Sequence, residues 1–271
     1  MKLRSFVIGF GLGLMLAGQP LNAQQSEADR QTLAELRAKA ESGDALSQFH
    51  LGAAFSVGKF GMATNYMEAV KWFRKAAEQN LPEAQFNLGI LYHEGQGVAQ
   101  DDVEALKWTR KAAGQNFALA QHNLGVCYDK GQGVVKDAVE AVKWYRKAAD
   151  QNYPESQYSL GCSYSEGEGV EKDQVEAVKW WRKAAVQNFP SAQFALGNRY
   201  TTGQGVATSY VEAAMWFRQA AEQGHAGAQN NLSLCYARGQ GVTMDVIEAV
   251  KWWRKAANQN DRDNNRHQTS R

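Results

Sequence analysis

The sequence predicts an all-α protein, a solenoid of helix pairs, and three observations predict it. A tryptophan recurs every 36 residues between residues 72 and 252. Each one lies in a segment whose small and apolar residues are spaced three and four apart, as on one helix face. Glycine-rich turns separate the segments, and a fixed period of this size is typical of stacked repeats. The tryptophans are Trp72, Trp108, Trp144, Trp180, Trp216 and Trp252.

The first 23 residues have the pattern of a secretory signal peptide. Lys2 and Arg4 precede the apolar run Phe6 to Ala17, and a small-residue end predicts cleavage after Ala23. The run is shorter than the roughly 20 apolar residues of a membrane span, although an uncleaved anchor is an alternative. We therefore expect a periplasmic or secreted protein with no membrane insertion after cleavage.

The charge balance argues against polyanionic partners. Removing residues 1–23 takes Lys2 and Arg4 from the 30 basic side chains and none of the 28 acidic ones, which leaves a formal charge of zero. Binding to phosphates needs a surplus of Lys and Arg, so neither nucleic acid nor anionic lipid is expected as a partner.

The three cysteines, Cys127, Cys162 and Cys235, are predicted to be packed thiols. Cys127 and Cys235 stand at equivalent positions three repeats apart, too far to pair. Cys127 and Cys162 are on adjacent repeats but out of register, so a disulfide between them is the alternative.

Residues 24–44 are predicted to be a polar segment and an N-terminal cap helix. From about Glu27 to Ser42, Leu33, Leu36 and Ala40 share one helix face. Such a helix can cover the first repeat.

Six repeats are predicted over residues 45–260, each with a helix A and a helix B. In the second repeat, helix A (84–94) buries Leu88 and Gly89 and ends at a Gly-x-Gly-Val turn. Helix B begins at Asp101, with Glu104 completing a capping box. The six B helices are predicted to end at Asn80, Asn116, Asn152, Asn188, Gly224 and Asn260.

Two places depart from the repeat. The first turn, Gly58 to Met62, is one residue longer and more apolar than the others. Residues 261–271 contain no apolar side chain and are predicted to be a disordered polar tail. No closing helix then covers the last pair, so Trp252 and Trp253 are expected near an open end.

The repeated unit resembles the Sel1-like repeat, a relative of the tetratricopeptide repeat. The residues that carry the resemblance are Ala84-Gln85-Phe86-Asn87-Leu88-Gly89, Tyr92, Gly95-Gln96-Gly97-Val98 and Glu104-Ala105-Leu106-Lys107-Trp108, with Arg110-Lys111-Ala112-Ala113. The resemblance implies an α/α right-handed superhelix whose A helices line a concave surface that binds proteins or peptides. Exported members resemble envelope regulators, host-interaction factors, or cysteine-rich proteins with a proposed β-lactamase activity. This chain lacks the regular cysteine pairs of the last group.

Candidate partner-binding residues are those that differ between repeats on the outward side of helix A. They are Phe86, Asn87, Ile90, Glu94, His122, Asn123, Val126, Tyr158, Ser159, Phe194 and Asn198. Aromatic side chains beside mixed polar groups suit a peptide groove. The alternative is that the aromatic residues only seal adjacent A helices together.

The lysine and arginine row on helix B is expected to be a solvated face. Each of Lys71, Lys107, Lys143, Lys179 and Lys251 follows a glutamate by three residues, which favours salt bridges over a polyanion track.

No catalytic, metal or cofactor site is predicted. The five histidines have no metal-ligand spacing, and no nucleophile, base and orienting group can be proposed. The Gly-x-Gly-Val turns follow no strand, so they do not resemble phosphate loops.

The sequence thus predicts an exported scaffold or adaptor that binds a protein or peptide on its A helices, in envelope regulation or signalling. The alternatives are a β-lactamase-like hydrolase and a host-interaction virulence factor. The oligomeric state is left open.

Overall fold

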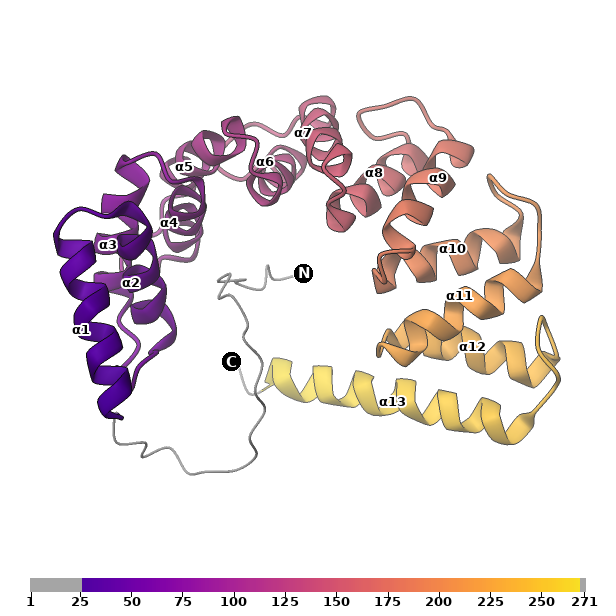
Figure 1. The fold of residues 1–271 in the computed structure, drawn as a ribbon. Helices are drawn as coiled ribbons and strands as arrows, with labels where there is room; N and C mark the ends of the chain where they lie inside the picture. The colour runs from indigo at the N-terminus through magenta and orange to yellow at the C-terminus, as the bar shows by residue number, and fades with distance from the viewer. Residues whose placement is uncertain (1–25, 269–271) are drawn as a thin grey trace. The chain divides into compact units, whose positions relative to one another are not determined.

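The protein is all-α over the residues that the structure describes. The computed structural model describes residues 26–268, with side chains described to residue 258. These residues form thirteen helices and no strand (Figure 1). The helices are α1 (Glu27–Glu41), α2 (Ala45–Val57), α3 (Tyr66–Glu78), α4 (Pro82–Glu94), α5 (Asp102–Gly114), α6 (Ala118–Lys130), α7 (Ala138–Asp150), α8 (Pro154–Glu166), α9 (Gln174–Ala185), α10 (Pro190–Thr202), α11 (Tyr210–Glu222), α12 (Ala226–Arg238) and α13 (Val246–Gln268). The even-numbered helices are the A helices, and α3 to α13 with odd numbers are the B helices.

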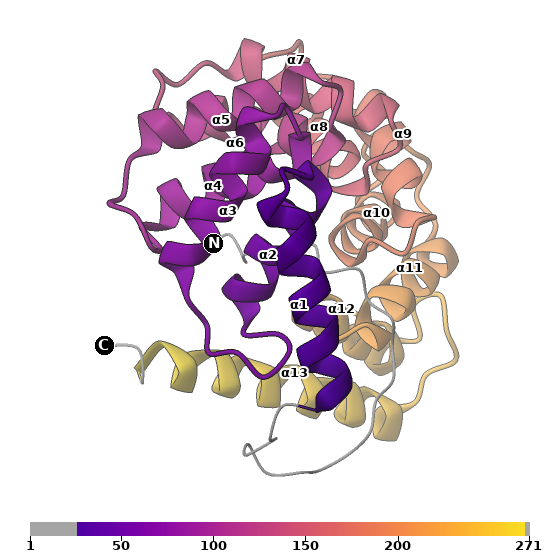
Figure 2. The same cartoon turned by 60° about the vertical axis from the view of Figure 1, so that its left-hand side comes forward.

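The chain divides into two compact units. Unit 1 covers residues 1–137 and holds α1 to α6, and unit 2 covers residues 138–271 and holds α7 to α13. Within each unit, every helix packs on the next one along the chain. Figures 1 and 2 show α1 beside α2 in unit 1, and α13 beside α12 in unit 2. The predicted stack of helix pairs, with its cap helix, is therefore confirmed within each unit.

Local signals start and stop the B helices as predicted. Asn65 Oδ1 accepts a hydrogen bond from the Glu68 amide at 3.1 Å, and Asp245 Oδ1 accepts one from the Glu248 amide at 2.9 Å. Such caps stabilise a helix by about 1 kcal/mol each. After the helix, Asn80, Asn116, Asn152, Asn188 and Gly224 adopt positive φ, between 62° and 87°.

The core of each repeat is built from small residues and the repeated tryptophan. Alanines of helix B such as Ala184 and Ala220 are 0% exposed, as are the leucines of helix A such as Leu196. Five of the six repeated tryptophans are between 5% and 9% exposed, and Trp144 is half-buried. Alanine lets the helices approach closely, and the indole then fills the remaining space.

The second glycine of the Gly-x-Gly-Val turn packs against an earlier helix, which the sequence pattern did not reveal. Gly97, Gly133 and Gly169 have positive φ, and each lies against the backbone at the start of the preceding helix B. A Cβ at these positions would lie closer than 3.0 Å to that backbone. Only glycine satisfies both the conformation and the contact.

The irregular first turn packs beneath the cap helix. Phe60 and Met62 lie against the cluster of Leu33 and Ala40 from α1 with Leu51 from α2. The extra apolar residues therefore extend the contact between α1 and the first repeat. This contact explains why the first turn differs from the others.

The last helix differs from its sequence prediction. α13 continues to Gln268, so the predicted stop at Asn260 is wrong, and helix replaces the predicted disordered tail over residues 261–268. In inner repeats the left-handed residue turns the chain toward the next A helix. No described helix A follows α13, so no such packing partner holds Asn260 in the left-handed conformation that Asn80 adopts, and the helix continues past it.

None of the described helices is long and apolar enough to span a membrane. The predicted signal peptide, residues 1–23, lies outside the described residues.

Candidate functional site

A buried glutamine in helix A joins three helices. Gln85 is 1% exposed, and its Nε2 donates to the carbonyl oxygen of Ala77 in the preceding helix B at 3.1 Å. Its Oε1 accepts from Nε2 of Gln115, at the end of its own helix B, at 2.8 Å. The same bond at 2.8 Å joins Gln79 to Gln48, Gln187 to Gln157 and Gln223 to Gln193. A buried amide bonded on both sides stabilises the stack, so these glutamines are occupied by the fold.

The arginines of helix B bind tyrosines of the next helix A. Arg110 donates to the Tyr128 hydroxyl at 3.0 Å, and Arg182 donates to that of Tyr200 at 2.7 Å. Arg74 with Tyr92, Arg146 with Tyr164 and Arg218 with Tyr236 form the same pair. These arginines therefore link consecutive repeats. The sequence analysis had predicted only a solvated row of lysines and arginines and did not predict these links.

The lysines of helix B form the predicted salt bridges. Lys179 Nζ lies 2.9 Å from Glu176, and Lys107 Nζ lies 3.1 Å from Glu104. Lys71, Lys143 and Lys251 pair in the same way. A second set of lysines lies over the tryptophan rings, as Lys183 does at 3.7 Å from the Trp180 centroid. The lysines of this basic row thus have partners within their own helix.

The aromatic residues on the flank of helix A pack against the start of the next helix A. Phe86 is 2% exposed and meets Phe117 edge-on, with ring centroids 5.8 Å apart. Tyr158 meets Phe189 in a tilted arrangement, with ring centroids 5.5 Å apart. Phe194 stacks on His225 at 4.6 Å. This geometry favours the sealing role for these rings, and it leaves Phe86 almost no surface for a partner.

The remaining predicted residues lie on one side of the A helices, here called the helix-A face. The face consists of Asn87, Ile90 and Glu94 with their counterparts in the other repeats. Asn87 is 4% exposed and donates to the Glu83 carbonyl oxygen at 2.8 Å. The candidates Ile90, Glu94, His122, Asn123, Val126, Ser159 and Asn198 are half-buried. The accessible part of this face is therefore made of half-buried side chains of mixed size and polarity that differ between repeats.

The structure brings two members of this face together between repeats of unit 2. Asn231 Nδ2 of α12 donates to Asn198 Oδ1 of α10 at 2.9 Å. Leu234, one turn further along α12, is 46% exposed. An amide pair beside an exposed leucine offers hydrogen-bonding groups and apolar surface to a peptide.

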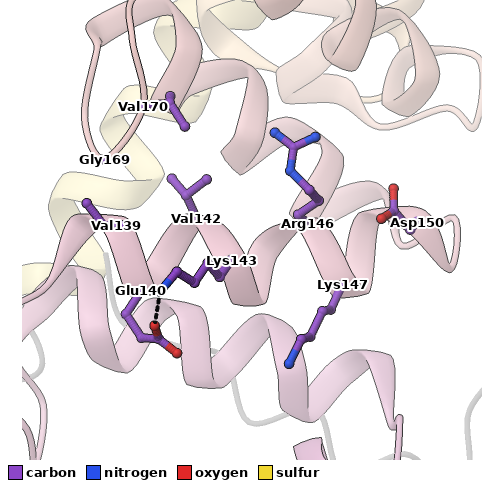
Figure 3. Close-up of a pocket in the computed structure, with 9 residues that line it drawn as sticks. All are labelled: Val139, Glu140, Val142, Lys143, Arg146, Lys147, Asp150, Gly169 and Val170. Atoms are coloured by element: carbon purple, nitrogen blue, oxygen red, sulfur yellow. Dashed lines mark hydrogen bonds and ion pairs between the residues drawn. The ribbon is translucent and has the colours of Figure 1, made fainter.

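A shallow pocket of about 470 Å³ lies in unit 2 between α7 and the turn after α8. Val139, Val142 and Val170 give it apolar walls, and Figure 3 shows Lys143 bonded to Glu140 at its edge. Its other cations, Arg146 and Lys147, are engaged by Tyr164 and by the Trp144 ring. The pocket lies on helix B, away from the helix-A face, and its charges have partners within the fold.

The three cysteines lack the lowered pKa that a nucleophilic thiol needs. Burial raises the pKa of the Cys127 thiol to about 11, and burial also raises the pKa of Cys162 and of Cys235. These thiols stay protonated at neutral pH, whereas a nucleophilic cysteine needs a lowered pKa. All three are unpaired in the structure.

One histidine–carboxylate pair occupies a position at which a later repeat has a different hydrogen bond between the same two kinds of helix. His93 Nδ1 lies 2.6 Å from Asp102 Oδ1, which joins the end of α4 to the start of α5. At the same place in a later repeat, Gln174 Nε2 donates to the Ser165 carbonyl oxygen at 2.7 Å. The pair therefore links two helices. No group of three or more His, Cys, Asp or Glu residues in the described part of the chain could hold a metal ion.

A protein-family model matches the repeats of this chain. The Sel1 repeat model matches six consecutive segments, residues 45–81, 82–117, 118–153, 154–189, 190–225 and 226–261. The chain belongs to the Sel1 repeat family. Sel1 repeats are generally scaffolds for protein–protein interaction.

Solved Sel1 repeat structures resemble this chain. The uropathogenic Escherichia coli protein c5321, described as a protective antigen, is 38% identical over 87% of this chain, with a TM-score of 0.81. The chain spans 50% of that protein's length. A Sel1 repeat protein from Oxalobacter formigenes is 34% identical over 85% of this chain and 67% of its own, with a TM-score of 0.78. A search among curated proteins finds no match.

A more distant structure shares the fold alone. The immunity protein PA5088 from Pseudomonas aeruginosa is 21% identical over 79% of this chain and 81% of its own, with a TM-score of 0.52.

The Sel1 repeat uses several residues that sequence reasoning did not assign. The arginine–tyrosine pairs are always 18 residues apart, and this constant spacing could have revealed them. The Asn198–Asn231 bond had no such signal, because Asn198 occurs in one repeat only, at a position where Ile90, Val126 and Leu234 stand in others. The assignment of partner-binding residues stays a prediction.

Proposed function

We propose that this chain is a non-catalytic scaffold that binds a protein or peptide through its helix-A face. The observation that carries the proposal is that recurring and varying side chains lie in different places. Side chains that recur in all or nearly all repeats are used within the fold, as in the bonds of Gln85, Arg110 and Lys179. Side chains that vary and stay accessible lie on the helix-A face. Varying residues on a constant framework can give specificity without changing the fold.

The predicted signal peptide supports an activity outside the cytoplasm. An exported adaptor would act in the periplasm or beyond it, and we propose a role in envelope regulation or signalling. The neutral charge of the chain after Ala23 supports a protein partner over a polyanion.

The proposal is tested by capture of partners from bacterial envelope extracts. Tagged protein is compared with a face variant, Asn198→Ala with Leu234→Ala, and with a control on the outer side of helix B, Val175→Ala with Lys179→Ala. Val175 and Leu234 are similarly exposed, at 52% and 46%, so neither pair should unfold the protein. We expect the face variant to lose a captured protein at least about tenfold, because interface energy concentrates in a few residues.

The control should retain that protein. Equal loss in both variants, or no loss in the face variant and in further face variants at Ile90 and Glu94, would contradict binding through this face. Circular dichroism of each variant confirms that the helices are intact.

A host-facing role is the second candidate, because the protein c5321 is described as a protective antigen of uropathogenic strains. The two roles differ in the destination of the protein. Cell fractionation that finds the whole protein in the periplasm would contradict the host-facing role.

The hydrolase alternative makes a separate prediction. We expect purified protein to leave a chromogenic β-lactam intact even at high protein concentration, because the chain lacks the regular cysteine pairs of the group for which that activity is proposed. Hydrolysis that co-purifies with the protein would contradict a purely non-catalytic scaffold.

A further inference from the structure

Helix α10 holds an arginine where every other helix A holds an uncharged residue. Arg199 is half-buried near the end of α10. The residues at the same position in the other repeats are Ala54, Leu91, Cys127, Ser163 and Cys235. Ala54, Leu91 and Cys235 are between 2% and 6% exposed. A position that is small or apolar elsewhere in the array therefore holds a permanent positive charge in this repeat.

Neighbouring side chains fix the direction of the Arg199 guanidinium group. Its Cζ lies 5.1 Å from the ring centroid of Trp181, which is itself buried. Nη1 donates to Oε1 of Gln204, and Nη2 donates to Oγ of Ser165 at 3.4 Å. Ser165 is held in turn by Gln174, whose Nε2 donates to the Ser165 carbonyl oxygen at 2.7 Å. The guanidinium group is thus positioned between α8 and α10 before any ligand binds, which lowers the entropic cost of binding.

The fold does not neutralise the charge of Arg199. Among the described residues no Asp or Glu forms an ion pair with it, and its two bonds go to neutral oxygens. Its Nε donor is buried without an acceptor, unlike that of any other arginine in the described part of the chain. A partly buried charge without a counter-ion and an unsatisfied donor both cost folding free energy, and the contact with Trp181 offsets only part of that cost. Stability therefore does not explain an arginine at this position, whereas binding of an anion does.

Arg199 borders the helix-A face on the side of α8. It follows Asn198 of that face and reaches Ser165, which precedes Glu166 of the face on α8. Burial raises the pKa of the Cys162 thiol, Glu166 adds to that shift and Arg199 opposes it, so both charges act on this part of the face. Glu166 is exposed, and water therefore screens its charge. A group bound on the helix-A face between α8 and α10 would lie beside the guanidinium group.

We propose that Arg199 binds a carboxylate of the partner, the side chain of an aspartate or a glutamate, at the border of the helix-A face. Nη1 and Nη2 each use one N–H within the fold, so another N–H on each remains for a carboxylate. The single positive charge matches the single negative charge of that group. The Asn198–Asn231 pair on the same face can bond to the peptide backbone beside it. The proposal rests on the proposed function, because it names the chemistry that the helix-A face recognises.

A first experiment tests Arg199 without the partner. The arginine Nε–H signals of the nitrogen-15-labelled chain are followed by NMR while sodium acetate replaces sodium chloride at constant ionic strength. Acetamide is the neutral control ligand, and the Arg199→Gln variant assigns the Arg199 signal. We expect a saturable shift of this signal with acetate and none with acetamide. Arg238, exposed on the same face at the end of α12, is the internal control, and we expect its acetate affinity to be at least about tenfold weaker because it is not held in place.

A second experiment tests the carboxylate within a peptide. Peptides are selected from a random library on the immobilised chain, and each acidic peptide is compared with its Asn or Gln form. We expect the neutral form to bind the unchanged chain at least about tenfold more weakly, because a charge-assisted hydrogen bond is lost. Both forms should bind Arg199→Gln equally, whereas Arg238→Gln should keep the difference. Glu166→Gln should bind the acidic form more tightly, because a like charge is removed.

The Arg199→Gln variant should fold, because the other repeats have uncharged residues at this position, and circular dichroism checks it. An Arg199 signal that responds equally to acetate and acetamide, or no more strongly than Arg238, would overturn the proposal. Selected peptides without an acidic residue, or an acid preference that persists in Arg199→Gln, would also overturn it. A library that yields no peptide at all would contradict the proposed function instead, because the acetate titration decides the role of Arg199 by itself.

Discussion

Trp181 and Trp253 occupy the same position in two repeats but have opposite surroundings. Trp181 donates its indole N–H to the Tyr158 carbonyl oxygen at 3.2 Å and is 3% exposed. Trp253 is 59% exposed. Side-chain identity alone therefore does not fix the energetic role of a residue in this chain. The neighbouring helix decides it.

These two residues give a paired stability prediction. Trp181→Ala should destabilise unit 2 by about 3–5 kcal/mol, because it removes a large buried ring and leaves a cavity. Trp253→Ala should cost less than about 1 kcal/mol, because the ring is already largely in water. Urea unfolding followed by circular dichroism measures both. Similar losses in the two variants would contradict the difference in burial.

His225 makes the stability of α12 depend on pH. Its Nδ1 accepts from the Ala228 amide at 3.2 Å as the N-cap of the helix, and its ring stacks on Phe194. Burial lowers the pKa of this histidine below its ordinary value of 6.5. The unfolded chain then binds the proton more tightly, so stability is full above about pH 6.5 and is lost as the pH falls below it.

The matched variant for this prediction is His225→Asn, which keeps an N-cap acceptor but does not titrate. We expect the unchanged chain to lose more unfolding free energy than the variant between about pH 7.5 and about pH 5. Other titrating groups are shared by the two proteins and cancel in the comparison. Equal losses would mean that His225 does not titrate differently in the folded state.

Helix pairs in this chain pack closely because glycine occupies the crossing point. A Cβ on Gly161 would lie closer than 3.0 Å to the ring of Trp181. Gly114, at the end of α5, has nothing within 4 Å of such a Cβ. The two glycines are both helical, so they form a test and its control.

Gly161→Ala should destabilise the protein by about 1–3 kcal/mol, because the added methyl group overpacks the contact between the two helices. Gly114→Ala should be neutral or stabilise by up to about 1 kcal/mol, because alanine is the better helix former. Thermal unfolding of the two variants and of the unchanged chain measures both changes in stability. A stabilising Gly161→Ala would show that the helices can separate without cost.

The molecule as a whole is two compact units built from one kind of repeat. In such arrays each repeat is stabilised mainly by its nearest neighbours. Damage in one repeat should therefore spread to adjacent repeats more than to distant ones.

Amide hydrogen exchange can follow this spread in the Trp181→Ala variant. We expect faster exchange in α8 to α11, which surround the substituted residue, and little change in α2 to α5 of unit 1. A uniform increase over both units would show that the whole chain unfolds as one cooperative body.

The sequence alone determined the helix pairs and, apart from the end of α13, where the B helices start and stop. The caps at Asn65 and Asp245 and the left-handed Asn80 act within a few residues of chain, so local pattern reveals them. The 36-residue spacing of the tryptophans adds the stacking of repeats, because a pattern repeated six times needs one recurrent packing partner. The resemblance to Sel1-like repeats follows from the same residues, and the family match confirms it.

Only the tertiary structure decided which surfaces stay open. Phe86 is sealed by Phe117, while the Trp253 ring is left in water, and nothing in their immediate sequence distinguishes these outcomes. The contact of the second glycine with an earlier helix and the helical residues after Asn260 were equally hidden. The physical reason is that burial belongs to a pair of surfaces: a side chain leaves water only where a second helix, distant in the chain, lies against it.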